Sequence, residues 1–215
     1  MLEFDLLKPN EVAGITGVSA YNQRNLRRAS YLHRNEGGHA RFTPLETAEL
    51  LVIGQMSERG IGPKVATTFA DTAARGIFMN LLWRPEIYSP EAAALAFEAS
   101  RTDFEIGLPG AEIAVERELT EAERLQLHGG CARRWLAETL ERQSGMSGEK
   151  APAHFVHWPN GHSEFFYGED HPFADVQFNH PAWQGPAIMF TLGGMAALFA
   201  SRLPRPIVLL KKGKE

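Results

Sequence analysis

The chain of 215 residues can bury a full hydrophobic core in one or two domains, and its 44% hydrophobic and 22% charged residues are typical of soluble globular proteins. The single cysteine, Cys131, excludes an internal disulfide framework. The sequence has neither a signal-peptide pattern nor an apolar run that spans a bilayer, so we expect a cytoplasmic protein with no membrane partner. The net charge of −4 divides unevenly, because residues 1–84 hold ten basic and eight acidic residues whereas residues 85–215 hold twelve and eighteen.

Residues 9–28 predict two short helices joined by a tight turn. Val12 and Ile15 lie three apart on the first helix, and Gly17 can take the positive φ of a sharp corner. Ser19 is a good N-cap for the second helix. That second helix is almost entirely polar, so we expect it to face something other than a core. All of its polar side chains can hydrogen-bond to base edges or phosphates.

A Gly-Gly hairpin with a basic exit is predicted directly after these helices, in the stretch NEGGHARF at residues 35–42. A helix-turn-helix followed at once by a small hairpin is a winged helix-turn-helix. Five arginines and one glutamate lie between Ala20 and Phe42, which places positive charge where phosphate contact needs it. A solvated surface would also explain such a cluster if it stood alone.

Residues 9–75 resemble the DNA-binding domain of MerR-type transcriptional regulators. The shared motifs, in order, are Thr16–Ser19, Arg24–Arg28, Glu36–Gly38, Arg41–Phe42 and the capped helix from Thr43. The sequence departs from the family pattern at Gln23, where an apolar residue is usual, and at Ala40, where a second wing arginine is common. Related winged helices also serve phage excisionases and terminase subunits. The resemblance therefore implies duplex DNA binding, in a transcriptional regulator or in one of these accessory proteins.

The DNA contacts expected from the recognition helix and the wing involve nine residues. The recognition helix would enter the major groove, and the wing would touch the phosphate backbone. Arg27 has an alternative role as an internal salt-bridge partner. The nine residues are Ser19, Tyr21, Asn22, Gln23, Arg24, Arg27, Arg28, His39 and Arg41.

Two longer helices are predicted next. Thr43, Pro44 and Glu46 form a capping box that starts a helix ending near Arg59. A second helix runs from Lys64 to about Trp83. Its last turns, residues 77–83, are almost continuously apolar, so we expect them to lie under a second domain of the same chain or at a dimer contact.

Residues 85–150 predict a helical connecting and dimerising segment. It begins with a short helix at residues 89–101, followed by a loop at residues 107–110 and a brief strand at residues 113–115. Thr120 caps a long helix to about Gln143, in which Gly129-Gly130 predicts a kink or a close helix contact. Its apolar stripe, which includes Leu125, Trp135 and Leu140, is a candidate dimer surface.

Residues 151–215 predict a small α+β unit. Its expected elements are a hairpin of residues 154–158 and 164–167 across Asn160-Gly161, a strand at 176–178, a buried helix at 186–202 and a closing strand at 207–210. Five histidines between His154 and His180 suggest a metal site, but a strand would direct His154 and His157 to opposite faces. Aromatic residues in this region form either an effector pocket or a core.

The sequence as a whole predicts an α+β protein with three parts, at residues 1–84, 85–150 and 151–215. We expect a sequence-specific regulator that binds double-stranded DNA as a homodimer, without a cofactor or catalytic residues, at the nucleoid. The C-terminal part would sense a small molecule or contact a partner protein. The alternatives are a phage or mobile-element accessory protein that binds DNA, and a module whose winged helix contacts protein.

Overall fold

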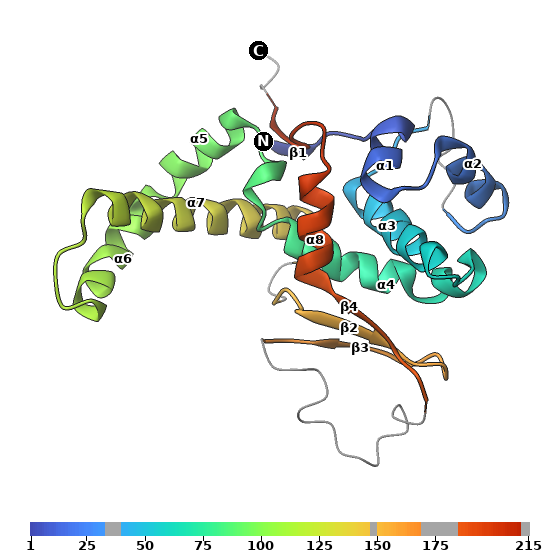
Figure 1. The fold of residues 1–215 in the computed structure, drawn as a ribbon. Coiled ribbons are helices and arrows are strands. Elements are labelled where there is room, and N and C mark those ends of the chain that lie inside the picture. The colour runs from blue at the N-terminus through green and yellow to red at the C-terminus, as the bar shows by residue number, and fades with distance from the viewer. Residues whose placement is uncertain (33–39, 147–149, 169–184, 212–215) are drawn as a thin grey trace. The chain divides into compact units, whose positions relative to one another are not determined.

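The computed structural model describes residues 1–32, 40–146, 150–168 and 185–211. These residues form a mixed α+β fold with eight α-helices and two small sheets (Figure 1). The chain divides into two compact units. The first unit contains residues 4–81 and 150–205, and the second contains residues 1–3, 82–149 and 206–215. This grouping differs from the three consecutive segments expected from the sequence, because residues 150–168 and 185–205 pack with the N-terminal helices.

The first unit begins with helices α1 (Pro9–Thr16) and α2 (Ala20–Arg28). Gly17 ends α1 with a φ of 76°, a left-handed conformation that glycine adopts without strain. The Ser19 Oγ accepts a hydrogen bond from the Asn22 N–H at 3.2 Å and caps α2. The predicted pair of helices, turn and cap are therefore confirmed.

Helices α3 (Pro44–Glu58) and α4 (Pro63–Leu81) follow and pack against each other. The capping box is confirmed, since the Glu46 N–H donates to Thr43 Oγ1 at 3.1 Å and the Thr43 N–H donates to Glu46 Oε2 at 2.7 Å. The apolar residues 77–79 and 81–82 are buried. Of the two expectations for this run, burial within the chain is confirmed.

A three-stranded antiparallel sheet lies beside α4. Its strands are β2 (His154–His157), β3 (Ser163–Phe166) and β4 (Ile188–Thr191), in the order β3-β2-β4. The predicted hairpin is confirmed by the pairing of β2 with β3. The prediction of a helix at residues 186–202 is wrong in its first part, which contains β4. Only α8 (Leu192–Ser201) is helical. Strand pairing is favoured there because Phe190 packs against the Phe155 and Phe69 rings.

Helix α8 crosses α4 and closes the first unit (Figure 1). The contact is close at Gly76, where an added Cβ would lie 2.7 Å from Leu192 Cδ1, 2.9 Å from Phe165 Cε1 and 3.2 Å from Pro152 Cγ. One turn further on, Asn80 Nδ2 donates to the Pro152 carbonyl oxygen at 2.8 Å. Pro152, Phe165 and Leu192 thus dock onto α4 where it has no side chain.

Two arginines after α8 attach this segment to α1. Arg202 Nη1 donates to the Ile15 carbonyl oxygen at 2.9 Å, and Arg205 forms ion pairs with Asp5 and with Glu11, the latter at 2.9 Å. Burial alone would raise the pKa of Glu11, but the hydrogen bonds from Arg205 and the Lys8 N–H outweigh it, so the pKa is lowered. The Glu11 carboxylate is therefore held in its charged form.

The second unit is mostly helical. Its elements are β1 (Leu2–Phe4, whose last residue belongs to the first unit), the 3₁₀ turn η1 (Pro85–Ile87), α5 (Pro90–Ala99), α6 (Arg101–Ala114), α7 (Glu121–Gln143) and β5 (Val208–Leu210). Strands β1 and β5 form a two-stranded sheet. The helix predicted after Ser89, the long helix capped by Thr120 and the closing strand are confirmed.

For the second unit one prediction is wrong, and one alternative of another is excluded. The loop and strand expected at residues 107–115 are instead the last turns of α6 and its C-cap Val115, and α6 continues through Pro109. Its half-buried residues Phe104, Leu108 and Ala111 follow helical spacing, and Arg124 Nη2 of α7 bonds Glu112 Oε1 at 2.8 Å. Packing on α7 thus outweighs the local breaker signals. Helix α7 also runs uninterrupted through Gly129-Gly130, where an added Cβ would meet no atom within 4 Å, so the close contact expected there is absent.

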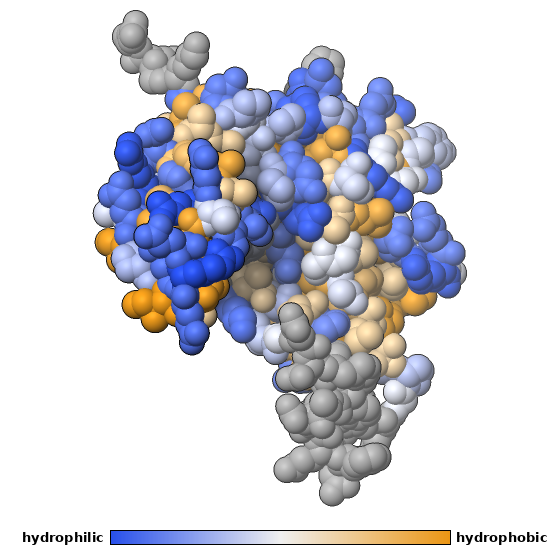
Figure 2. Space-filling view, turned by 60° about the vertical axis from the view of Figure 1, so that its left-hand side comes forward, coloured by the Kyte–Doolittle hydropathy of each residue, from blue (hydrophilic) through white to orange (hydrophobic). Residues whose placement is uncertain are grey.

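The face of the molecule drawn in Figure 2 is largely hydrophilic, with scattered apolar patches. Within the described ranges, no helix has both the length and the apolar character needed to cross a membrane. The most exposed apolar side chains of α6 and α7 are Ile106, Ile113 and Leu125, which are 74%, 76% and 63% exposed.

Replacing Gly76 with leucine should lower the free energy of unfolding by about 2 kcal/mol or more, because the new side chain would overlap three buried neighbours. The matched control is Gly129→Leu, also within a helix but with open space around it, which should raise stability by about 0.5–1 kcal/mol. Urea unfolding monitored by circular dichroism measures both. Equal effects of the two substitutions would contradict the close packing at Gly76.

Candidate nucleic-acid interface

Helix α2 has one face fixed to the protein and another in solvent. Gln23 and Leu26 are buried beneath it, at 2% and 9% exposure. Tyr21, Arg24 and Arg28 are exposed on the other side, and Tyr21 is 65% exposed. Their spacing of three, four and seven residues places them on one face of a helix. This outward face, defined as Tyr21, Arg24 and Arg28, retains three of the predicted contact residues.

Gln23 was predicted to contact DNA, and the structure contradicts this. Its Nε2 donates to the Pro9 carbonyl oxygen at 3.0 Å and to the Val18 carbonyl oxygen at 2.8 Å. A buried amide that satisfies two backbone carbonyls cannot also reach a base edge. Gln23 therefore occupies the inward position that the MerR-type pattern gives to an apolar residue, and it fastens α2 to the start of α1.

Arg27 lies at the side of α2 and is half-buried. Its guanidinium carbon is 4.0 Å from the centre of the Phe42 ring, and its Nη2 donates to the Arg41 carbonyl oxygen at 3.4 Å. The internal role expected as an alternative is present, but as a cation–π contact instead of a salt bridge. The charge of Arg27 is thus held against the protein.

The end of the predicted wing stretch is attached to the start of the chain. The Leu7 N–H donates to the Phe42 carbonyl oxygen at 2.8 Å, and the Phe42 N–H donates to the Leu7 carbonyl oxygen at 3.0 Å. Arg41, next to this bridge, is exposed. His39 and the predicted Gly37-Gly38 hairpin lie outside the described residues.

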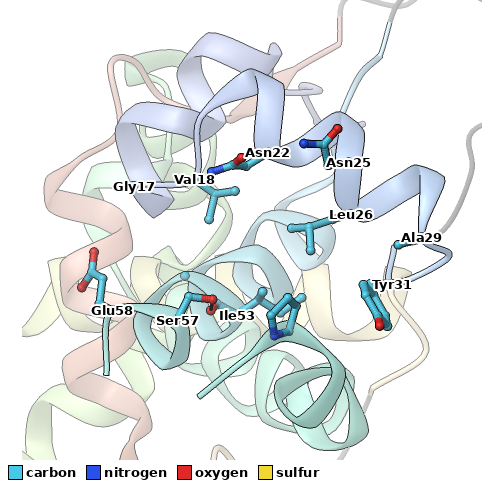
Figure 3. Close-up of a pocket in the computed structure, with 12 residues that line it drawn as sticks. Gly17, Val18, Asn22, Asn25, Leu26, Ala29, Tyr31, Ile53, Ser57 and Glu58 are labelled. Carbon is cyan, nitrogen blue, oxygen red and sulfur yellow. Dashed lines mark hydrogen bonds between the residues drawn. The ribbon is translucent and has the colours of Figure 1, made fainter. Parts of the chain in front are cut away.

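A groove of about 380 Å³ separates α2 from α3 (Figure 3). Val18, Leu26 and Ile53 give it an apolar floor, and Glu58 is the charged residue among those that line it. Asn22 borders this groove, so its amide lies at the edge of the outward face. Ser19, also predicted as a contact, is exposed while its oxygen caps the helix.

Asn25 was not among the predicted contacts, although it follows Tyr21 by four residues and precedes Arg28 by three. It is half-buried on the groove side of α2 (Figure 3). Its amide can both donate and accept hydrogen bonds, as base-edge recognition requires. The helical spacing in the sequence was sufficient to find it.

Several aromatic residues and one histidine of the C-terminal segment are buried. Phe155 and Trp158 are fully or almost fully buried, so they belong to the core and not to a pocket. His157 is buried with Nδ1 2.7 Å from Ser163 Oγ, and burial lowers its pKa. No group of three or more potential metal ligands occurs in the described part of the chain. The predicted strand at 176–178 lies outside that part.

Replacing Gln23 with alanine should lower the free energy of unfolding by about 2 kcal/mol, because one buried and one partly buried carbonyl oxygen lose a hydrogen bond. Arg24→Ala, one residue away but exposed, should change stability by less than about 0.5 kcal/mol. Thermal unfolding of both variants tests the orientation of α2. If Arg24→Ala proves the more destabilising, the helix is turned differently about its axis.

Comparison with known proteins does not extend this description, since no family model, curated protein or solved structure matches the chain. The resemblance to MerR-type domains therefore rests on the order of motifs in the sequence.

Proposed function

We propose that the chain binds double-stranded DNA through the outward face of α2 and acts as a sequence-specific transcriptional regulator of MerR-like type. The supporting observation is that α2 carries Tyr21, Arg24 and Arg28 in solvent while Gln23 and Leu26 hold its opposite face. A helix fixed along one side can lie in a major groove without reorganising. Arginine and tyrosine would supply bidentate base contacts and phosphate contacts.

The electrostatic setting of α2 agrees with this role. Helix α2 contains no acidic residue, and Arg27 and Arg28 lie in its last turn. Arginines at a helix C-terminus also interact favourably with the helix dipole, which would explain their presence without DNA. That explanation does not account for Arg24, which lies in the middle of the helix, or for the exposed Tyr21 ring.

We further propose that the protein binds as a homodimer. One winged helix reads a short site, and two copies on half-sites about 34 Å apart would give useful specificity. Of residues 77–83, one of the two expected dimer surfaces, residues 77–79 and 81–82 are buried within the chain, whereas Trp83 is 41% exposed. In the other expected surface Leu140 is buried and Leu125 is exposed, as are Ile106 and Ile113 of α6.

The DNA proposal predicts that Arg24→Ala and Arg28→Ala weaken binding to duplex DNA. Each lost phosphate contact should also reduce the slope of log affinity against log salt concentration by about 0.9. Arg133→Ala is the control, because Arg133 is exposed on α7 in the second unit. Fluorescence anisotropy with genomic duplex fragments, measured at several salt concentrations, reports both quantities.

The proposal would be abandoned if both α2 variants bound DNA with wild-type affinity and salt dependence. Absence of all binding to duplex DNA at low salt would instead favour an interaction with protein. Clustered binding sites at recombination ends, in place of promoter palindromes, would favour the accessory role in mobile elements.

For the dimer, Leu125→Glu and Ile113→Glu should each shift the protein towards monomer, because a charge would enter an apolar contact. Val65→Glu is the matched control, since Val65 is 52% exposed on α4 in the first unit. Sedimentation velocity at micromolar concentration measures the change. A protein that is monomeric both free and on DNA, with a footprint of one half-site, contradicts the dimer.

A further inference from the structure

Strand β4 lies at one edge of the three-stranded sheet. It pairs with β2 on one side, and no strand of the described residues pairs with its other side. A groove of about 470 Å³ runs along all four residues of β4 and is closed on its far side by the end of α3. Open strand edges are templates for another extended chain, and proteins usually protect them.

The hydrogen-bond pattern identifies which backbone groups face the groove. The Trp158 N–H donates to the His162 carbonyl oxygen at 2.9 Å, so residues 156 and 154 bond to β3 and residues 155 and 157 bond to β4. Their partners in β4 are Phe190 and Ile188. The N–H and C=O of Met189 and the N–H of Thr191 therefore point to the open edge, since backbone groups alternate along a strand.

The remaining walls of the groove are mostly apolar. The end of α3 contributes Met56 and, after it, Ile61, and α8 contributes Met195. Met189 of β4 is 43% exposed beside them. Methionine side chains adapt to varied shapes, as sites that bind peptides often require.

Arg59 supplies the single formal charge among the residues that line the groove. Its Nη1 donates to the Gln55 carbonyl oxygen at 2.8 Å and to Gln55 Oε1 at 3.0 Å, which fixes the guanidinium plane. Its other N–H groups bond to no described residue, and an arginine held in this way is suited to a carboxylate.

From these observations we propose that the β4 edge is a docking site for an extended acidic peptide of a partner protein. The peptide adds a strand to the sheet through the backbone of Met189 and Thr191. Its apolar side chains enter the methionine-lined groove, and an aspartate or glutamate pairs with Arg59. This is recognition by strand addition, in which backbone bonds give affinity and side-chain pockets give selectivity.

The positive charge of Arg59 favours an acidic peptide over a second copy of this chain as the partner of β4. Two β4 edges paired across a two-fold axis would bring two Arg59 guanidinium groups towards one another, with no carboxylate in the lining of either groove. Like charges facing each other weaken such a contact, whereas an acidic peptide neutralises Arg59. The site is independent of α2, so its test does not depend on DNA binding.

The probe is the capped peptide Ac-Val-Asp-Val-Asp-Val-Asp-NH₂, titrated into the isotope-labelled full chain and followed by nuclear magnetic resonance. We expect saturable shifts of the Met189 and Thr191 amides and of the Arg59 side chain, with a dissociation constant of about 0.1 mM. The same peptide with alternate N-methyl amides keeps its side chains but cannot extend a ladder, so its affinity should fall at least about tenfold. A lysine-for-aspartate peptide should bind similarly weakly.

Two matched variants separate backbone pairing from side-chain effects. Met189→Pro removes the outward donor without breaking a bond to β2, so it should weaken peptide binding about tenfold while the fold persists. Met189→Ala keeps the donor and should bind within about threefold of wild type. Arg59→Gln should remove the preference for the aspartate peptide over its serine counterpart.

The proposal is overturned if no β4 amide shifts at millimolar peptide, or if Met189→Pro binds as Met189→Ala does. It is also overturned if the Met189 amide is already protected from hydrogen exchange in the peptide-free protein, because the edge would then be paired. If Met189→Pro unfolds the chain, the comparison of the N-methylated peptide with its parent gives the same decision on the wild-type protein.

Discussion

Gly76 allows β3, α8 and the segment before β2 to pack closely against α4, and much of the first unit depends on that contact. A side chain at this position would overlap Leu192, Phe165 and Pro152, which come from α8, β3 and the segment before β2. Because these segments pack closely against α4, the Asn80 amide can donate a hydrogen bond to the Pro152 carbonyl oxygen. Arg202 and Arg205 then extend the attachment to α1, through the Ile15 carbonyl oxygen and the carboxylates of Asp5 and Glu11. A helical N-terminal segment and a β-rich C-terminal segment thereby form one packed body.

This connection also orients α2. Gln23 bonds the carbonyl oxygen of Pro9, the first residue of α1, so the helix that carries Tyr21, Arg24 and Arg28 is fastened to α1 on its inner side. Contacts continue from α8 and the residues after it, through α1, to the inner face of α2. Such a series would let an event in the C-terminal segment, such as strand addition at β4, alter how α2 is held. The physical requirement is a ligand that binds one arrangement of these contacts better than another.

Local signals in the sequence were sufficient for α1 to α4, because caps and turns are decided by neighbouring residues. Thr43 with Glu46, Ser19 with Asn22 and the left-handed Gly17 all act within a few residues. The errors arose where distant residues decide. Pro109 marks a loop by local rules, yet packing of Phe104 and Glu112 on α7 keeps α6 helical. Gln23 is polar in type, but its donors are used by backbone carbonyls from two other positions in the chain. The docking at Gly76 joins residues too far apart in sequence for any periodicity to reveal.

The most direct test of the account places a photo-crosslinker on the outward face of α2. Replacing Tyr21 with benzoyl-phenylalanine and irradiating the protein with duplex DNA should yield a covalent protein–DNA product, since Tyr21 is 65% exposed on that face. The same residue placed at Tyr167, which is 54% exposed after β3, should yield none. Crosslinking at Tyr167 without crosslinking at Tyr21 would contradict the assignment of α2 as the DNA-binding element.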